Sequence, residues 1–154
     1  MKPLYIFDLD GTLANLEHRL HFIQPPPGEK KNWDKFHEAC REDTQHLRTI
    51  LTLGCLQKAG ADIWVFSGRS ASVRRQTEIW LWANTPLPIS SFVNVRMRPI
   101  GDYRDDAILK EEWLQTMSKE DRSRLIAVFE DRQRVVDMWR RNGVVCYQVA
   151  SGNF

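Results

Sequence analysis

The 154-residue sequence has few cysteines and no long apolar run. Its three cysteines are widely spaced and form no Cys-x-x-Cys pair, which predicts free thiols in a cytoplasmic protein rather than disulfides or a zinc site. The apolar run near the N-terminus is four residues long, too short for a signal peptide. No segment approaches the roughly 20 apolar residues of a membrane span, so we expect no membrane association.

The sequence gives no positive indication of a polyanion-binding protein or of a P-loop ATPase. The formal net charge is only +2, which neither requires nor opposes a polyanionic partner. The chain contains no Gly-x-x-x-x-Gly-Lys-Ser/Thr loop, so a P-loop ATPase is not expected. The length predicts a single domain over residues 1–154. Neither length nor composition indicates an oligomeric state.

What is present is organised around Leu4–Leu13, in which four apolar residues run into Asp8, Leu9, Asp10 and Gly11. An apolar run without polar alternation predicts a strand buried on both faces, as in a parallel sheet. Side chains alternate along a strand, so both carboxylates leave on the same side, and Gly11 permits a sharp turn. Crowded carboxylates suit a hard divalent cation such as Mg²⁺. The alternative is a strand-end turn that only caps a helix.

The rest of the chain alternates between strand and helix patterns, which predicts an α/β fold with helices on both faces of a five-stranded parallel sheet, in strand order 3-2-1-4-5. About residues 15–43 form an insertion after the first strand, with a short helix from Trp33 to about Arg41 capped by Asn32. Asp43 or Thr44 is expected to cap the next helix. The other expected strands are 62–66, 92–97, 125–129 and 144–149, and the expected helices run to Lys58 and over 71–83, 105–117 and 133–142.

Polar residues follow three of these strands. Ser67 and Arg69 follow the second, and Glu130 and Asp131 follow the fourth. Neighbouring parallel strands present their carboxyl ends at one edge of the sheet, so these groups are expected to meet Asp8 and Asp10 there. Lys110, with Asp106 one helical turn earlier, is expected to face the same place. A metal ion, cations and carboxylates together suit phosphoryl transfer, in which a carboxylate can be the nucleophile.

Several aromatic, histidine and arginine residues have a simpler interpretation. Trp33 and Phe36 can stack on a nucleobase, but we interpret them as the small core of the insertion. His18 and His21 are expected to be exposed loop residues. The pairs Arg74/Arg75 and Arg140/Arg141 are either solvated helix faces or a phosphate-binding patch.

In this order, Asp8-Leu-Asp-Gly-Thr12, a serine after strand two, a lysine before strand four and acids after it resemble the four motifs of the haloacid dehalogenase (HAD) superfamily of phosphatases. Over nearly the whole chain except Leu20–Asp43, the sequence is similar to the 3′-phosphatase domains of bacteriophage polynucleotide kinases. This similarity is carried by Arg104-Asp-Asp106, Lys110-Glu-Glu112, Asp131-Arg132, Val135-Val136, Met138-Trp-Arg-Arg141 and Gln148-Val-Ala-Ser-Gly-Asn-Phe154.

The resemblance implies a HAD-like Rossmannoid three-layer fold and a role for each matching residue. Asp8 is the nucleophile that forms an aspartyl-phosphate, and Asp10 is the general acid and then the general base. Asp106 and Glu130 are supporting residues, Asp106 by orienting Lys110, and Glu130 stands where the phage domains have Asp. The metal ligands for Mg²⁺ are Asp8, Asp10 through its backbone carbonyl, and Asp131. The phosphate and substrate-binding set is Thr12, Arg19, Ser67, Gly68, Arg69 and Lys110.

The expected function is therefore a Mg²⁺-dependent phosphomonoesterase that removes 3′-phosphates from nucleic-acid ends in repair, with a separate kinase or ligase as a possible partner. The small insertion is expected to leave the cleft open to a large substrate. Two alternatives are a phosphatase of free nucleotides and a non-catalytic module that binds nucleic-acid ends.

Overall fold

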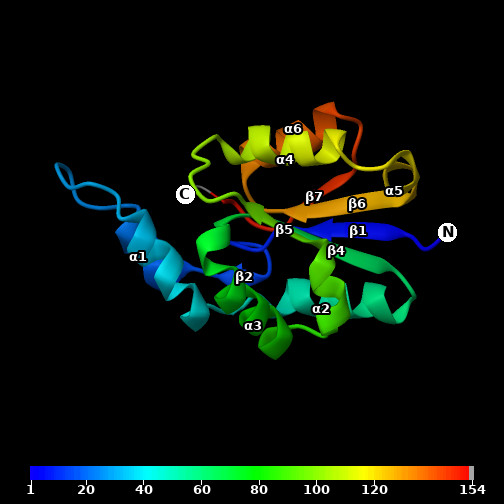
Figure 1. Cartoon of the computed structure of the whole chain (residues 1–154), viewed down its shortest axis with the longest axis horizontal. Helices are drawn as coiled ribbons and strands as arrows, with labels where there is room; N and C mark the ends of the chain where they lie inside the picture. The colour runs from blue at the N-terminus through cyan, green and yellow to red at the C-terminus, as the bar shows by residue number, and fades with distance from the viewer. Residues whose placement is uncertain (153–154) are drawn as a thin grey trace.

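The fold is built on a parallel five-stranded sheet in the order β5-β4-β1-β6-β7, seen in Figure 1, which confirms the predicted order. The structure is a computed structural model and describes residues 1–152, so Asn153 and Phe154 of the C-terminal motif lie outside the described residues. The strands are β1 (Leu4–Phe7), β4 (Asp62–Ser70), β5 (Val95–Arg98), β6 (Leu125–Glu130) and β7 (Cys146–Gln148).

The central strand β1 is buried on both faces, as its uninterrupted apolar sequence predicts. Leu4 and Ile6 pack into one hydrophobic cluster, and Phe7 packs into the other, on the opposite face of the sheet. All three side chains are fully buried. Because β1 lies between β4 and β6, its carboxyl end is flanked by the ends of both neighbours.

Two pairs of helices cover the sheet, one pair on each face (Figure 1). On one face, α2 and α3 contribute Leu53 and Trp80 to the core; on the other, α4 and α6 contribute Leu114 and Trp139. These helices are α2 (Leu47–Lys58), α3 (Arg74–Asn84), α4 (Asp106–Gln115) and α6 (Gln133–Arg141). The short helix α5 (Lys119–Arg124), which we did not predict, precedes β6 and begins at the N-cap Ser118.

Several predicted boundaries need correction. Helix α2 begins at Leu47, because Thr44–Gln45 (β3) pairs with Ala14–Asn15 (β2) in a small antiparallel ladder. The expectation that Asp43 or Thr44 caps α2 is therefore wrong. Strand β4 extends to Ser70 because Ser70 pairs with Arg98 of β5. The segments Ala71–Val73 and Ile89–Asn94 form 3₁₀ turns where a helix start and a strand start were expected.

The insertion has its own small core. Leu16, Ile23 and Phe36 form a separate hydrophobic cluster, which holds the short helix α1 (Trp33–Glu38) to the turn over Glu17–Phe22. Asn32 caps α1 as predicted, accepting from the backbone N–H of Lys35 at 3.0 Å. A second 3₁₀ turn over Ala39–Glu42 follows. Within the described residues, no helix is long and apolar enough to cross a membrane.

Candidate active site

The carboxyl ends of β1, β4 and β6 bring the predicted polar residues together. Asp8 leaves β1 with its backbone N–H donating to Phe129 of β6 at 2.9 Å, so the ends of these two strands are in register. Ser67 lies in β4 and Asp131 directly follows β6. Lys110 extends from α4 to Asp8, 102 residues away in the sequence.

Three carboxylates form what we call the acidic cluster, Asp8, Glu130 and Asp131, whose ligand oxygens lie within 4.8 Å of one another. All three are buried, at 5%, 1% and 2% exposure. Lys110 Nζ donates to Asp8 at 2.5 Å and to Glu130 at 2.7 Å. One ammonium therefore faces three acids, and the predicted convergence of Asp8 and Asp131 is confirmed as geometry.

The charges of the acidic cluster are incompletely neutralised. Burial, followed by the neighbouring acids, raises the pKa of Asp8 to about 7 and that of Asp131 to about 9. Burial opposes the charge of Lys110, but Asp8 and Glu130 outweigh it and raise the pKa of the ammonium. Asp131 Oδ1 is buried and has no hydrogen-bond partner among the described residues. An unpartnered carboxylate oxygen among crowded acids fits a hard divalent cation.

Two glycines allow close approach to Asp131. A Cβ on Gly11 or on Gly152 would collide with Asp131 Oδ2. Gly11 has φ +86°, the left-handed conformation that its turn requires. The Gly152 N–H donates to the Asp131 carbonyl at 3.1 Å, so the segment after β7 packs directly over this acid. Both glycines therefore leave room that the Asp131 carboxylate occupies.

Asp10 belongs to a second group, the paired cluster, made of Asp10, Asp43, Arg19 and Arg69. Arg19 Nη2 donates to Asp10 at 2.7 Å and to Asp43 at 2.7 Å. Arg69 Nη2 donates to the same two carboxylates, to Asp43 at 2.8 Å. Burial would raise the pKa of Asp10, but the guanidinium groups of Arg69 and Arg19 outweigh it and hold that pKa well below its usual range.

Asp43 is the site residue that sequence reasoning missed. Its side chain is fully buried, and His18 Nε2 contacts its Oδ1 at 2.9 Å. Its backbone carbonyl accepts from Trp80 Nε1 at 2.7 Å. His18 is exposed as expected, but its ring also contacts this buried acid. Nothing in the sequence around Asp43 separates it from a helix cap, since its partners lie 24 and 26 residues away.

Both arginines of the paired cluster are buried. Arg19 has 0% exposure, and it is also held by the Phe36 carbonyl at 3.2 Å and by the Phe36 ring. Its guanidinium holds Asp10, and the expected contact of Arg19 with a phosphate stays a prediction. Arg69 is 1% exposed but does line the cavity described below, so its contact with a phosphate stays a prediction.

The remaining phosphate-binding candidates lie beside these clusters. Ser67 is buried and its Oγ accepts from the Arg69 N–H at 3.1 Å. Thr12 Oγ1 is buried without a partner among the described residues. Gly68 approaches Asp106 so closely that a Cβ would collide with its carboxylate. The roles of Ser67, Thr12 and Gly68 toward a phosphate stay predictions.

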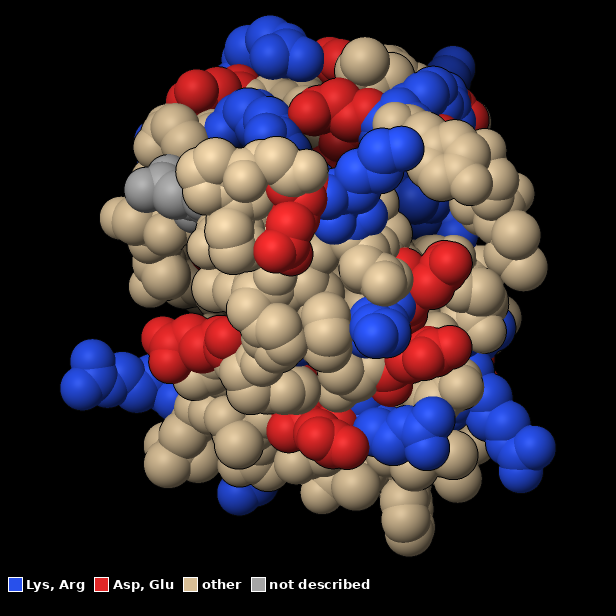
Figure 2. All heavy atoms as spheres, turned by 90° about the vertical axis from the view of Figure 1, so that its left-hand side faces the viewer, with Lys and Arg blue, Asp and Glu red and all other residues tan. Residues whose placement is uncertain are grey.

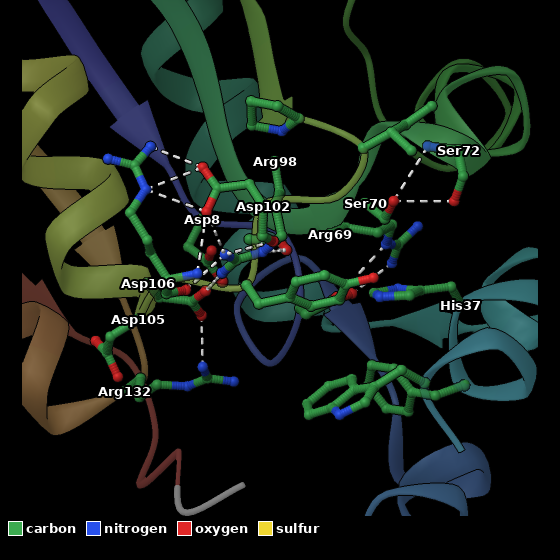
Figure 3. Close-up of a pocket in the computed structure, with 18 of the residues that line it drawn as sticks. Asp8, His37, Arg69, Ser70, Ser72, Arg98, Asp102, Asp105, Asp106 and Arg132 are labelled. Atoms are coloured by element: carbon green, nitrogen blue, oxygen red, sulfur yellow. Dashed lines mark hydrogen bonds and ion pairs between the residues drawn. The ribbon is translucent and has the colours of Figure 1, made fainter. Parts of the chain in front are cut away.

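Asp106 makes different contacts from those implied by the resemblance. It accepts from Arg98 and, at 2.5 Å, from Arg132 (Figure 3), whereas Lys110 is oriented by Asp8 and Glu130. The charge of Asp106 still helps to raise the pKa of Lys110. Among the described residues, no direct hydrogen bond joins Asp106 to Lys110, so the orientation of Lys110 by Asp106 stays a prediction that would act through its charge.

A cavity of about 450 Å³ opens onto both clusters. Its inner wall includes Asp8, Asp10 and Asp131, and its outer wall is formed by α1 and by residues 98–105, from the last residue of β5 onward (Figure 3). The entrance lies at the face shown in Figure 2, where basic and acidic side chains are interspersed. The site can therefore admit a molecule larger than a phosphate ion.

The sequence matches the family described as "Polynucleotide kinase PNKP phosphatase domain" over residues 2–154. Among solved structures, two with TM-score 0.74 are chains of a Pnkp1/Rnl/Hen1 RNA repair complex, with 28% and 27% identity to this chain. They cover 99% of this chain, which spans only 44% and 48% of their length.

A more distant structural neighbour is the class C acid phosphatase from Bacillus anthracis with tungstate bound, with TM-score 0.66 and 16% identity. The match covers 99% of this chain and 68% of that chain. This likeness supports the HAD-like Rossmannoid fold.

Proposed function

This chain belongs to the family of polynucleotide kinase phosphatase domains, within the HAD phosphatases, and on that premise we propose that it hydrolyses 3′-phosphates at nucleic-acid ends. The single observation that carries the proposal is the buried contact of Lys110 with Asp8 at 2.5 Å, inside the acidic cluster and beside Asp10. We further propose that residues 1–154 act as one domain whose insertion, residues 15–43, borders the entrance.

In the first proposed step, an Asp8 carboxylate oxygen attacks the phosphorus of the phosphomonoester. The phosphorus–oxygen bond to the sugar breaks, and the leaving oxygen takes a proton from Asp10. Asp10 is deprotonated in the free protein, because Arg19 and Arg69 lower its pKa. A phosphate dianion beside Asp10 raises that pKa, so substrate binding favours the proton uptake that the step needs.

In the second step, Asp10 removes a proton from a water molecule that attacks the aspartyl-phosphate. The bond between Asp8 and phosphorus breaks, which releases inorganic phosphate and restores the Asp8 carboxylate. Lys110 keeps its charge because its pKa is raised, so it can stabilise the phosphoryl oxygens throughout.

Mg²⁺ is the proposed cofactor, held by Asp8 and Asp131, with the Asp10 backbone carbonyl as a further proposed ligand. When bound, it would supply charge neutralisation and orientation of the phosphoryl group. Glu130 belongs to the same cluster but is occupied by Lys110 at 2.7 Å, which supports its role as a supporting residue.

The test is phosphate release by purified protein from a 3′-phosphorylated oligonucleotide, compared with nucleoside 3′- and 5′-monophosphates. We expect the oligonucleotide to be hydrolysed with the higher kcat/KM in the presence of Mg²⁺. Turnover of monomers alone would support the free-nucleotide phosphatase instead. Binding of oligonucleotide without any turnover would support the non-catalytic module, although a binder has no need for three crowded acids.

The likeness to chains of an RNA repair complex supports RNA ends as substrates and a role in repair. We propose that a separate kinase or ligase acts on the same ends, and that the protein acts in the cytoplasm. Both DNA and RNA oligonucleotides belong in the comparison above.

A further inference from the structure

The outer wall of the cavity is aromatic, which neither the phosphate chemistry nor the core requires. The wall includes Trp33 and His37 of α1 and Tyr103 of the segment after β5. These residues line the same cavity as Asp8 and Asp10, so a molecule bound at the catalytic acids extends toward them.

Trp33 is not the core residue that we expected. Phe36 is 3% exposed and anchors the insertion, whereas Trp33 is 46% exposed and meets the Phe36 ring edge-on at 5.7 Å. The His37 ring is stacked with Trp33 at 6.1 Å. Tyr103 is 92% exposed. Trp33 and Tyr103 therefore both keep aromatic surface that a ligand can cover.

Both aromatic segments are held in place. Arg98 donates to the Arg104 carbonyl at 2.6 Å and to the Gly68 carbonyl at 2.8 Å, and Arg104 Nη2 donates to Asp102 at 2.7 Å. These bonds fasten the backbone on both sides of Tyr103 to the end of β4. Because Arg19 binds the Phe36 carbonyl, α1 is tied to the same paired cluster that holds Asp10. The aromatic wall is therefore positioned before substrate binds.

The charges of the outer wall do not suit a phosphate backbone. Arg98 is bound to Asp106 and Arg104 to Asp102. Asp34 and Asp105 line the cavity beside them. A groove that follows phosphates needs uncompensated basic residues. Affinity for the part of the substrate beyond the phosphate must therefore come mainly from its apolar surface.

The pair Arg140/Arg141 lies away from the cavity. Arg140 is bound to the Cys146 carbonyl and Arg141 to Glu111, which favours a structural role for that pair.

We propose that Trp33 and Tyr103 form a nucleobase subsite, in which the base of the 3′-terminal nucleotide stacks while its phosphate lies at Asp8. The inference rests on the proposed function. Stacking is tolerant of sequence, because every base has an aromatic face, and it requires an end whose terminal base is unpaired. The preferred substrate is therefore a single-stranded or frayed 3′-phosphate end with any base.

His37 adds a polar group to this subsite. Its Nδ1 is buried without a hydrogen-bond partner among the described residues. Burial, followed by the nearby guanidinium groups, lowers the pKa of His37 despite the opposing effect of Asp10, so the ring is neutral near pH 7. A nitrogen of a neutral imidazole can form a hydrogen bond, as donor or acceptor, with a sugar hydroxyl or a base edge.

The test compares two single-stranded oligonucleotides that end in a 3′-phosphate and differ only in whether the terminal nucleotide carries a base or is abasic. We expect the wild-type protein to prefer the base-bearing end by about 5- to 100-fold in kcat/KM, mostly through KM. In Trp33→Ala, and more completely in Trp33→Ala/Tyr103→Ala, this preference falls toward one. Trp33→Phe retains it. The matched control is Trp82→Ala on α3, which removes a 62% exposed tryptophan outside the cavity and keeps the full preference.

A binding measurement tests the nucleobase subsite independently of turnover. In an Asp8→Asn background, anisotropy of labelled oligonucleotides should show the same dependence on the terminal base, with a weak dependence on salt. Equal kcat/KM for the two ends, or a preference that persists in the folded double variant, would overturn the subsite. Absence of phosphate release from every 3′-phosphate, with base-dependent binding intact, would instead contradict the proposed function and leave the subsite standing.

Discussion

The acidic cluster and the paired cluster lie side by side at the end of β1, yet they are neutralised in opposite ways. Asp8 shares a single ammonium, from Lys110, with Glu130 and faces Asp131 as well, and its pKa is raised to about 7. Asp10, two positions later, has two guanidinium groups, and its pKa is lowered. The surrounding charges, and not the residue type, decide the protonation of each carboxyl. The acidic cluster is thus suited to receive a cation, and the paired cluster is already neutral.

The largest expected effect comes from Asp8→Asn, which tests whether the acidic cluster contains the nucleophile. An amide cannot form the aspartyl-phosphate, so turnover should fall by roughly 10³-fold or more. Asp137→Asn, an exposed residue of α6, is the control and should keep full activity. Initial rates of phosphate release and thermal unfolding would be measured together. Near-normal rates in a folded Asp8→Asn protein would exclude covalent catalysis by Asp8.

The next effect tests whether the paired cluster acts through Asp10. Asp43→Asn removes one negative charge from the buried paired cluster. Asp10 is then the only carboxylate that Arg19 and Arg69 share, so the Asp10 side chain should change position. We expect kcat on an oligonucleotide 3′-phosphate to fall by about 10- to 100-fold, because a small displacement of a catalytic group lowers the reaction rate strongly. Breaking a buried ion pair also destabilises the fold by about 3 kcal/mol.

A substrate with a different leaving group distinguishes the effect of Asp43→Asn on catalysis by Asp10 from its effect on stability. p-Nitrophenyl phosphate has a leaving oxygen that needs little protonation, so the loss of kcat on this substrate should be much smaller than on the oligonucleotide. An equal loss on both substrates would show that Asp43 only stabilises the fold.

A smaller effect is expected from Gly152→Ala, which places a methyl group against Asp131 Oδ2. Displacing one proposed ligand should weaken Mg²⁺ binding by about tenfold. The apparent Mg²⁺ affinity follows from the metal dependence of the rate. The control is Gly54→Ala in α2, whose added Cβ meets only the Pro86 side chain at 3.4 Å. Unchanged Mg²⁺ dependence in Gly152→Ala would mean that Asp131 is not a ligand.

The smallest effect concerns stability and distinguishes the clusters directly. Burial, followed by the charges of Asp8 and Glu130, raises the pKa of Asp131 to about 9, so near pH 7 folding without a cation requires this carboxyl to take up a proton, which opposes folding. Mg²⁺ should therefore raise Tm of the wild-type protein by a few degrees, on the order of 2–4 °C for each 1 kcal/mol of binding.

In Asp131→Asn the repulsion is removed, so the metal-free Tm should rise slightly and the response to Mg²⁺ should disappear. Scanning calorimetry with and without EDTA measures both changes. A full Mg²⁺ response in Asp131→Asn would place the cation elsewhere.

The sheet order and the acidic cluster could be predicted from the sequence for the same reason. Apolar runs that end in Asp8, Ser67 and Asp131 are local patterns, and parallel topology brings the ends of neighbouring strands together. Sequence reasoning did not identify Asp43 or Tyr103 as lying at the site, and it placed Trp33 in the core of the insertion instead of at the cavity. The β2–β3 ladder made Asp43 a site residue instead of a helix cap, and such a ladder of two residues per strand has no sequence signature.

The sequence alone determined which strand ends carry carboxylates, because strand period and apolar runs are properties of adjacent residues. Tertiary structure decided which cation meets each acid, since Lys110 and Asp8 are 102 residues apart and Arg69 and Asp10 are 59 apart. It also decided which aromatic rings stay exposed. The physical reason is that electrostatic neutralisation and burial depend on distances in space, which local patterns do not encode.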